Sequence, residues 1–268
     1  MPELPEVETI ARAIRERYLG KEILRVFAWE SRIYKDINAN EFASRLSGRR
    51  INAVHRVGKY LYFDCGDCYP IFHLGMSGIF LQSRTQSKYP QHIHLEIHFK
   101  DGSELCFQDV RKFGKIKLSY HPPQFPELGV EPLSEEFTLH KFSKMLNLKA
   151  VRIKNFLMDQ SRVAGIGNIY ASEALFRAGI HPLRESNSLN REESEKLYLS
   201  IREVLREAIE RFGTTYSAYR TVTGETGENQ NFLNVYQRNG LPCPVCGSEI
   251  QKIIVNSRST FFCENCQR

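Results

Sequence analysis

The first stretch of the chain places its apolar residues at helical spacing. Five of them share one face between about residues 5 and 18: Val7, Ile10, Ala11, Ile14 and Tyr18. This period is typical of an amphipathic helix that packs on a core. Glu3, Glu6 and Glu8 crowd the start of the segment, where negative charge is favoured by the helix dipole. We therefore predict a first helix with an acidic N-terminus.

Patterns typical of strands follow this helix. Residues 51–57, 60–63 and 104–110 are rich in β-branched and aromatic side chains. The clearest strand covers residues 92–99, in which apolar residues alternate with His92, His94, Glu96 and His98. Alternate histidines on a strand usually form its exposed side, so we expect this polar face to lie in solvent.

Prolines divide the chain near its middle. Four of them fall within residues 120–133: Pro122, Pro123, Pro126 and Pro132. Proline cannot donate to a strand ladder and disfavours helix in the residue before it. We therefore place a domain linker in this segment.

The chain beyond this linker is predicted to be helical as far as about residue 212. Asn190 and Glu193 resemble a capping box. A buried stripe follows at helical spacing: Leu197, Ile201, Val204, Leu205, Ala208 and Phe212. Residues 214–231 are polar and contain Gly224 and Gly227, which predicts a mobile loop.

Composition narrows the class of protein. The chain has 268 residues, of which 41% are hydrophobic, which is enough for two modest globular domains or for one domain with a small appended module. It has no signal-peptide pattern and no run of about 18 apolar residues, so we expect a cytoplasmic protein that does not enter a membrane. The net charge of +6 is compatible with a polyanionic partner but does not establish one.

The cysteines predict one metal site. Four of them, Cys243, Cys246, Cys263 and Cys266, have the spacing C-x2-C-x16-C-x2-C, at which two knuckles deliver four thiolates to one tetrahedral zinc ion. Four thiolates close the coordination sphere, so this zinc should be structural. Lys252 and Arg258 lie between the knuckles, where they either grip phosphates or are ordinary solvated charges. Cys65, Cys68 and Cys106 lack a fourth partner and are expected to fill space.

A glycine-rich turn joins two predicted helices within residues 149–182. Gly165 and Gly167 allow the backbone to turn sharply and bring bare N–H groups to the start of the next helix, where a phosphate is favoured. Asn168 follows them. It could cap that helix, bond a phosphate, or do both.

The N-terminus offers a nucleophile. Met1 precedes Pro2, a residue small enough for an aminopeptidase to remove the methionine. The chain would then begin with a secondary amine whose reference pKa is near 8, so a useful fraction is unprotonated at neutral pH and can attack an electrophilic carbon. Glu3 is adjacent as a possible acid and base. Pro-Glu also begins many helices with no catalytic role.

Five motifs together resemble those of the formamidopyrimidine-DNA glycosylase family. They are residues 2–9 (PELPEVET), 73–78 (HLGMSG), 109–114 (DVRKFG), 165–173 (GIGNIYASE) and the cysteine tail. The resemblance spans the chain and implies an α+β fold. Residues 1–130 would form a β-sandwich with an N-terminal helix, residues 131–230 a helix-two-turn-helix domain with a lesion-covering loop, and residues 231–268 a zinc finger.

The resemblance also implies an activity: excision of oxidised purines, namely 8-oxoguanine and formamidopyrimidines, from duplex DNA, followed by β,δ-elimination at the abasic site. Pro2 matches the nucleophile that displaces the base from C1′ and forms a Schiff base, and Glu3 matches the proton donor and acceptor. Lys59 matches the lysine of excision and β-elimination, and Arg258 matches the arginine that grips the phosphates flanking the lesion. Glu6 would support the site.

Further residues match positions at which family members contact DNA. Six of them are His73, His92, Lys154, Asn168, Tyr236 and Lys252. Met76, Arg111 and Phe113 match the residues that fill the gap left by the extruded nucleotide; a base inside a duplex must be flipped out to be reached, and apolar wedges restore the lost stacking. The implied partner is damaged double-stranded DNA, bound by a nucleoid-associated monomer, and the implied cofactor is one structural zinc ion.

The chain departs from the family at two places. Residues 214–219 read TTYSAY, where the family usually has Leu-Arg-Asp or Leu-Lys-Asp after the threonine pair, so the preferred lesion stays open. Ala150 stands where many members carry a DNA-contacting lysine, and Lys149 or Arg152 could replace it.

Two other functions compete with this one. An endonuclease VIII-like glycosylase shares the fold and the amine chemistry but prefers oxidised pyrimidines; residues 73–78 together with Arg111 and Phe113 favour the purine enzyme. A non-catalytic lesion-binding protein is the second alternative. Intact Pro2, Glu3 and Lys59 argue against it, because pure binding requires none of them.

Overall fold

The computed structural model of the chain describes residues 1–216 and 219–268, which form two units. The first unit holds Met1–Phe125 and Arg211–Gln230. The second holds Pro126–Glu210 and Asn231–Arg268. Residues 211–230 therefore pack with the N-terminal part of the chain, although the helices of the second unit precede them in the sequence.

Helix α1 (Leu4–Tyr18) opens the first unit. Glu3 is its N-cap in a capping box: the Glu3 side chain accepts the backbone amide of Glu6, and the Glu6 side chain accepts the backbone amide of Glu3. The apolar face of the helix is buried in the core of the unit. The predicted first helix is confirmed.

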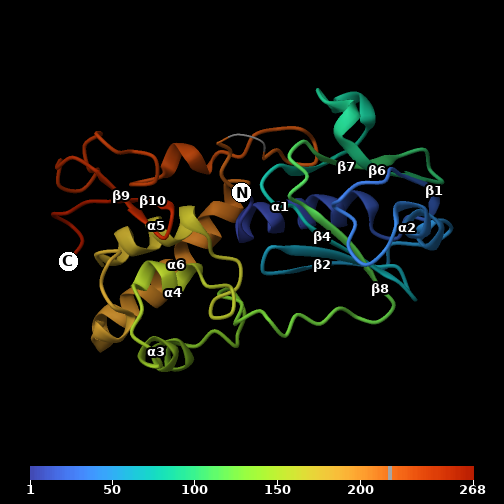
Figure 1. Ribbon diagram of the computed structural model, residues 1–268. Coiled ribbons are helices and arrows are strands. Elements are labelled where there is room, and N and C mark those ends of the chain that lie inside the picture. The colour runs from blue at the N-terminus through green and yellow to red at the C-terminus, as the bar shows by residue number, and fades with distance from the viewer. Residues whose placement is uncertain (217–218) are drawn as a thin grey trace. The chain divides into compact units, whose positions relative to one another are not determined.

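Two four-stranded antiparallel sheets complete this unit (Figure 1). One has the strand order β1 (Ile23–Ala28), β6 (Ile93–Phe99), β7 (Glu104–Asp109), β5 (Gly78–Leu81). The other has the order β2 (Ala53–Val57), β3 (Tyr60–Asp64), β4 (Tyr69–His73), β8 (Lys115–Ser119). The Phe72 ring lies 5.1 Å from Phe80 and 5.9 Å from Phe107 between centroids, which joins the sheets face to face. Helix α2 (Ala39–Leu46) packs on β1. The predicted sandwich is confirmed.

The prediction for the polar face of β6 is wrong. His94 and Glu96 are 4% and 7% exposed. The segment before the strand, with the 3-10 turns η1 (Arg84–Gln86) and η2 (Pro90–His92), supplies a partner for this face, because Arg84 forms an ion pair with Glu96. His92 itself ends η2 and precedes the strand.

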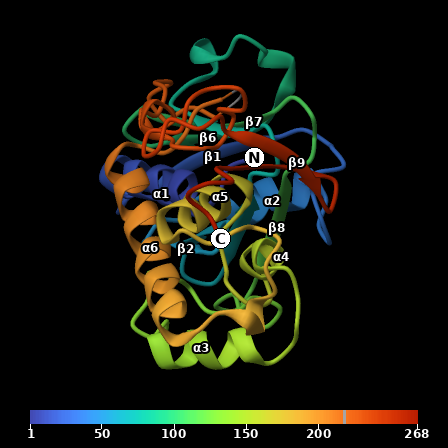
Figure 2. The ribbon, with the colours of Figure 1, turned by 90° about the vertical axis from the view of Figure 1, so that its left-hand side faces the viewer.

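The second unit is mainly helical. Its helices are α3 (Leu139–Asn147), α4 (Ile153–Met158), α5 (Asn168–Ala178) and α6 (Arg191–Glu210). Figure 2 shows α6 beside α5, with α3 near one end of α6. The hairpin of β9 (Gln251–Val255) and β10 (Arg258–Phe262) packs on α5. The predicted capping box is confirmed, because Asn190 and Glu193 each accept the other's backbone amide.

Helix α6 ends earlier than the apolar stripe predicts. Its last residue is Glu210, whereas Phe212 has a φ of +57° and is 56% exposed. The left-handed backbone at this point turns the Phe212 side chain away from the buried stripe, so including it in that stripe was wrong. The other five stripe residues are buried.

The segment that follows α6 forms a loop whose two ends meet. The amide of Asn229 donates to the Gly213 carbonyl at 3.1 Å, and a Cβ on Gly227 would lie 2.1 Å from that same oxygen. Tyr219 and Val222 belong to the core of the first unit. Part of the segment predicted to be a polar loop is therefore buried, and its predicted mobility stays a prediction. Of the unusual residues 214–219, Ser217 and Ala218 lie outside the described residues.

Among the described residues, no helix combines the length and the apolar character needed to span a bilayer.

Candidate active site and nucleic-acid interface

The start of the chain is held by hydrogen bonds to Glu6. This side chain is 1% exposed. Its Oε2 accepts the Glu3 amide at 2.7 Å, and its Oε1 accepts the Thr214 amide at 2.8 Å. A Cβ on Gly213 would lie 2.9 Å from Glu6 Oε1, so the loop after α6 approaches this carboxylate too closely for a larger residue. Glu6 thus fixes the backbone next to Pro2 and ties it to that loop.

Pro2 and Glu3 are both buried, whereas Met1 is 50% exposed. The Glu3 carboxylate accepts the backbone amide of Glu6. A residue held in this way has little freedom in its backbone, so the nitrogen of Pro2 has a defined position once Met1 is absent.

Lys59 sits in the tight turn between β2 and β3. Gly58 has a φ of +56°, and its carbonyl accepts Arg56 Nη1 at 3.1 Å. Arg56 Nε also donates to Glu8 Oε2 at 2.9 Å. Burial alone would raise the pKa of Glu8, but its bonds to Arg56 and Arg12 outweigh burial and lower that pKa. An ionised Glu8 therefore anchors the turn that carries Lys59, which is 7% exposed.

His73 lies close to Lys59. Burial first, and then the charges of Lys115 and Lys59, lower the pKa of His73 to about 4. Its Nδ1 accepts the Gly75 amide at 3.1 Å, so the neutral ring carries its proton on Nε2. His73 is thus a neutral hydrogen-bond donor near pH 7, suited to a phosphate oxygen.

The three gap-filling candidates lie on two neighbouring turns of the first unit. The Arg111 guanidinium lies over the Phe113 ring, 4.8 Å from its centroid, and Phe113 is 46% exposed. Met76 is on the other turn. A Cβ on Gly75 would lie 2.4 Å from the Phe113 carbonyl carbon, so the two backbones are in direct contact.

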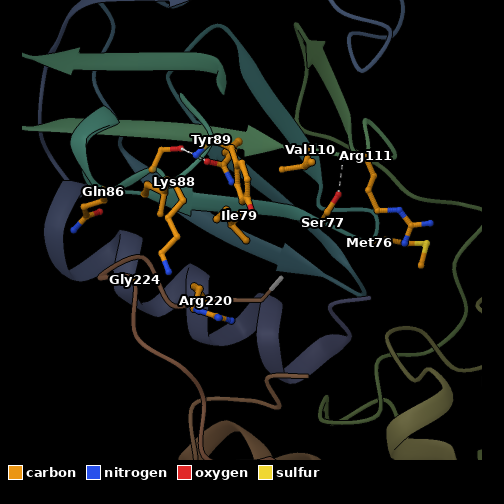
Figure 3. A pocket seen from close by; sticks show the side chains of 13 residues that line it. Met76, Ser77, Ile79, Gln86, Lys88, Tyr89, Val110, Arg111, Arg220 and Gly224 are labelled. Atoms are coloured by element: carbon orange, nitrogen blue, oxygen red, sulfur yellow. Dashed lines mark hydrogen bonds between the residues drawn. The ribbon is translucent and has the colours of Figure 1, made fainter. Parts of the chain in front are cut away.

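A pocket of about 610 Å³ adjoins Met76 and Arg111 (Figure 3). Ile79, Leu81 and Val110 give it an apolar wall. Three cations also line it: Lys88, Arg111 and Arg220. Figure 3 shows Lys88 reaching toward the segment of Arg220 and Gly224, with Met76 and Arg111 together at the opposite end. None of the described lining residues is acidic, so the pocket favours a partner rich in hydrogen-bond acceptors.

His92 lies beside this pocket. Its ring is 6.3 Å from that of Tyr89, which lines the pocket. The structure therefore places His92 in the same region of the first unit as Met76 and Arg111.

In the second unit, the four predicted cysteines come together. Their sulfur atoms all lie within 4.8 Å of one another. The hairpin of β9 and β10 lies between the two pairs, and Asn256 and Ser257 form its turn with φ of +46° and +58°. Arg258 follows that turn and is exposed, as is Lys252 on β9. The cluster has the donor set and the closeness that a tetrahedral zinc ion requires.

Lys154 and Asn168 both bond to strand β10. Lys154 is fully buried, and its Nζ donates to Thr260 Oγ1 at 2.5 Å and to the Ser259 carbonyl at 3.2 Å. Asn168 Nδ2 donates to the Ser259 carbonyl at 2.9 Å. Asn168 does not cap α5, because the N-cap residue is Gly167 and Asn168 is already the first residue of the helix. The capping alternative for Asn168 is therefore wrong.

Sequence reasoning missed several residues that hold these sites in place. Gln160 holds the glycine turn by two hydrogen bonds. Its Oε1 accepts the Gly165 amide at 2.9 Å, and its Nε2 donates to the Ile166 carbonyl at 2.7 Å. Glu173 is 3% exposed and holds the segment that contains Tyr236. A single acid on a mostly apolar helix was the available signal for Glu173. Nothing in the local sequence marks Gln160.

Three family models match the chain. The formamidopyrimidine-DNA glycosylase N-terminal domain matches residues 1–116, the formamidopyrimidine-DNA glycosylase H2TH domain matches residues 128–220, and a zinc finger found in FPG and IleRS matches residues 240–268. Together they cover both units.

Curated relatives agree with these models. The formamidopyrimidine-DNA glycosylase of Symbiobacterium thermophilum is 44% identical over 100% of this chain and 89% of its own length. That of Cytobacillus firmus is 41% identical over 100% of both chains.

Solved structures share the fold. MutM (Fpg) of Thermus thermophilus has a TM-score of 0.88 and 39% identity, covering 99% of this chain and 98% of its own. A Lactococcus lactis FPG mutant in complex with a Fapy-dG containing DNA has a TM-score of 0.92 and 37% identity over 100% of both chains. The wild-type Lactococcus lactis Fpg with an oxidized pyrimidine containing DNA has a TM-score of 0.91 and 37% identity over 100% of both chains. This chain therefore belongs to the formamidopyrimidine-DNA glycosylase family of DNA repair enzymes.

Proposed function

We propose that this protein is a bifunctional DNA glycosylase and abasic-site lyase that excises oxidised purines through the amine of Pro2. The observation that carries the proposal is the fixed start of α1. Glu3 and Glu6 cap each other, and Glu6 also binds Thr214. A nucleophile at Pro2 requires this kind of fixed position, because reaction rate depends strongly on the distance and angle of attack.

The proposed chemistry begins after Met1 is removed. The Pro2 nitrogen forms a bond to C1′ of the damaged nucleotide while the bond from C1′ to the base breaks, and the base leaves with a proton. Opening of the sugar ring, in which O4′ takes up a proton as its bond to C1′ breaks, gives a cationic Schiff base, an iminium ion, because the proline nitrogen is a secondary amine. Glu3 moves the protons of these steps, and Lys59 serves excision and the β-elimination, in which loss of a C2′ proton expels the 3′-phosphate.

The remaining predicted contacts hold the DNA in this proposal. His73, a neutral donor, and Arg258, an exposed cation after the β9–β10 turn, both suit phosphate oxygens. One structural zinc ion held by the four cysteines would keep the hairpin of Arg258 folded. Its four thiolates leave no open position for a reacting group.

The preference for oxidised bases has support in the pocket. Lys88 and Arg220 present only hydrogen-bond donors to this pocket, and oxidation adds carbonyl oxygens to a base. The loop that the family resemblance expects to cover the extruded base contributes Arg220 and Gly224 to this pocket. An oxidised purine is the favoured ligand because the curated relatives carry the formamidopyrimidine name.

Oxidised pyrimidines are the second candidate, since one similar Lactococcus lactis structure holds such a lesion. A panel of duplexes, each with one lesion, separates the two by strand cleavage. We expect 8-oxoguanine and formamidopyrimidine duplexes to be cut faster than duplexes with oxidised pyrimidines. Lys59→Ala should lose excision, whereas Lys117→Ala, a matched change on the edge strand β8, should not. Cleavage of pyrimidine lesions alone would overturn the assignment, and no cleavage of any lesion would favour a binding protein.

A further inference from the structure

One buried carboxylate joins the two turns that carry the gap-filling candidates. Asp109, the last residue of β7, is 0% exposed. Its Oδ1 accepts the Ser77 hydroxyl at 2.5 Å and the Arg111 amide at 3.3 Å. Its Oδ2 accepts the Gly114 amide at 2.7 Å. Because all three partners donate, both oxygens of the carboxylate act as acceptors.

Ser77 closes the same network. Its Oγ donates to Asp109 and accepts the Arg111 amide at 3.1 Å, the bond drawn in Figure 3. The turn of Met76 is therefore linked to the turn of Arg111 through one hydroxyl and one carboxylate. The close approach of Gly75 to the Phe113 backbone fixes their spacing from a second direction.

A third contact supports the outer side of the Arg111 turn. Arg32 Nη2 donates to the Arg111 carbonyl at 3.0 Å, and its Nε donates to the Lys112 carbonyl at 3.2 Å. Lys112 has a φ of +54°, a left-handed backbone that costs free energy in a residue other than glycine and persists where its surroundings enforce it. The backbone of the turn is thus held from both sides, while the Phe113 side chain stays exposed.

We propose that Asp109 is the positioning residue that holds Met76, Arg111 and Phe113 as one preformed group, so that all three enter the DNA gap together. The inference rests on the proposed function, because it concerns the extrusion step of that reaction. Separate flexible turns would each lose conformational freedom on entering the duplex, which weakens binding. A shared internal carboxylate removes that cost before DNA arrives.

The test is Asp109→Asn, which keeps the size of the side chain. If the amide oxygen replaces Oδ1, the amide nitrogen faces the Gly114 N–H, which loses its acceptor. If the amide is turned, the nitrogen faces the Ser77 hydroxyl, which loses its acceptor, while the Arg111 N–H keeps Ser77 Oγ. One donor loses its acceptor either way. The matched control is Glu96→Gln on the adjacent strand β6, a carboxylate that is 7% exposed and that pairs with Arg84 and His98.

Two substrates distinguish a loss of positioning from a general loss of enzyme structure. Excision from a lesion duplex needs the gap to be filled, whereas nicking of an abasic site in single-stranded DNA does not. We expect Asp109→Asn to lower kcat/KM on the duplex by about tenfold to a hundredfold, the effect of one unpaired buried donor, and to leave single-strand nicking within about threefold of wild type. Glu96→Gln should change the two substrates equally.

A double-variant comparison completes the test. If Asp109 acts through Arg111, then Asp109→Asn should change duplex excision far less in an Arg111→Ala background than in wild type. Equal loss on both substrates, or full additivity with Arg111→Ala, would overturn the inference. Failure of the wild type to nick the single-stranded abasic site would instead count against the proposed function, so the two failures are distinguishable.

Discussion

Replacing Glu173 by glutamine should destabilise the second unit far more than its conservative size suggests. The Oε1 of Glu173 accepts the amides of Val235 at 3.0 Å and Tyr236 at 2.8 Å. Its Oε2 accepts the Asn234 amide at 2.8 Å and the Asn234 Nδ2 at 3.1 Å. Glutamine keeps one oxygen and replaces the other with a donor. Whichever way its amide is turned, two donors lose their acceptor.

The magnitude follows from those two donors. A buried donor left without a partner costs about 1–3 kcal/mol, so Glu173→Gln should cost about 2–6 kcal/mol. That is a large share of the roughly 5–15 kcal/mol that keeps an ordinary domain folded. The segment it holds carries Tyr236, whose ring packs 5.2 Å from that of Phe261, so DNA affinity should fall as well.

Urea denaturation of the variant and of a matched control measures this effect. The control is Glu207→Gln, because Glu207 pairs with Arg177 of the same helix α5 at a site where the two side chains are 34% and 30% exposed. An ion pair of that kind contributes about 0.2–1 kcal/mol. A loss for Glu173→Gln no larger than that for Glu207→Gln would refute the reasoning. So would unchanged hydrogen exchange at the amides of Val235 and Tyr236.

Three further predictions follow from the two units. Arg111→Ala should lower the ratio of the excision rate on lesion:C duplexes to that on lesion:A duplexes, mainly by losing activity on lesion:C, because the donors of Arg111 match the O2 and N3 acceptors of cytosine. An unchanged ratio would mean that Arg111 only binds phosphate. Cys243→Ser should release the metal, unfold a hairpin with a small core of its own and abolish DNA binding while the first unit stays folded; active protein without zinc by elemental analysis would end this idea. Because burial lowers the pKa of His73 to about 4 in the folded protein, the unfolded chain binds this proton more readily between about pH 4 and 6.5. The free energy of unfolding should therefore fall as pH falls through that window. The same dependence of the urea midpoint on pH in His73→Gln as in wild type would contradict this.

The spacing of apolar residues along the chain predicted the helices and strands that pack through a uniformly apolar face. The face of α1 that carries Val7 and Ile10 is buried as expected, because any core satisfies an apolar stripe. The four cysteines were equally predictable, since their ligand spacing is contained in the sequence. The burial of His94 and Glu96 was not, because it depends on where the preceding segment places Arg84.

The residues that hold the sites in place were harder to predict than the candidates themselves. Glu173 bonds to Tyr236, which is 63 positions away in the sequence, and Glu6 bonds to Thr214, which is 208 positions away. Such pairs leave no periodic pattern. Asp109 lies within a recognised motif, yet its bonds to Ser77 and Gly114 follow only from the packing of two turns.

The central claim is that the Pro2 nitrogen bonds to the damaged nucleotide, and borohydride trapping tests it directly. Borohydride reduces a Schiff base to a stable bond, so protein that begins at Pro2 should form a covalent complex with lesion-containing duplex DNA. Mass spectrometry should locate the adduct on the N-terminal peptide. Protein with an N-terminal extension has no free amine at Pro2 and should not trap, while a C-terminal extension of equal length should have no effect. Equal trapping by the N-terminally extended protein would show that Pro2 is not the nucleophile.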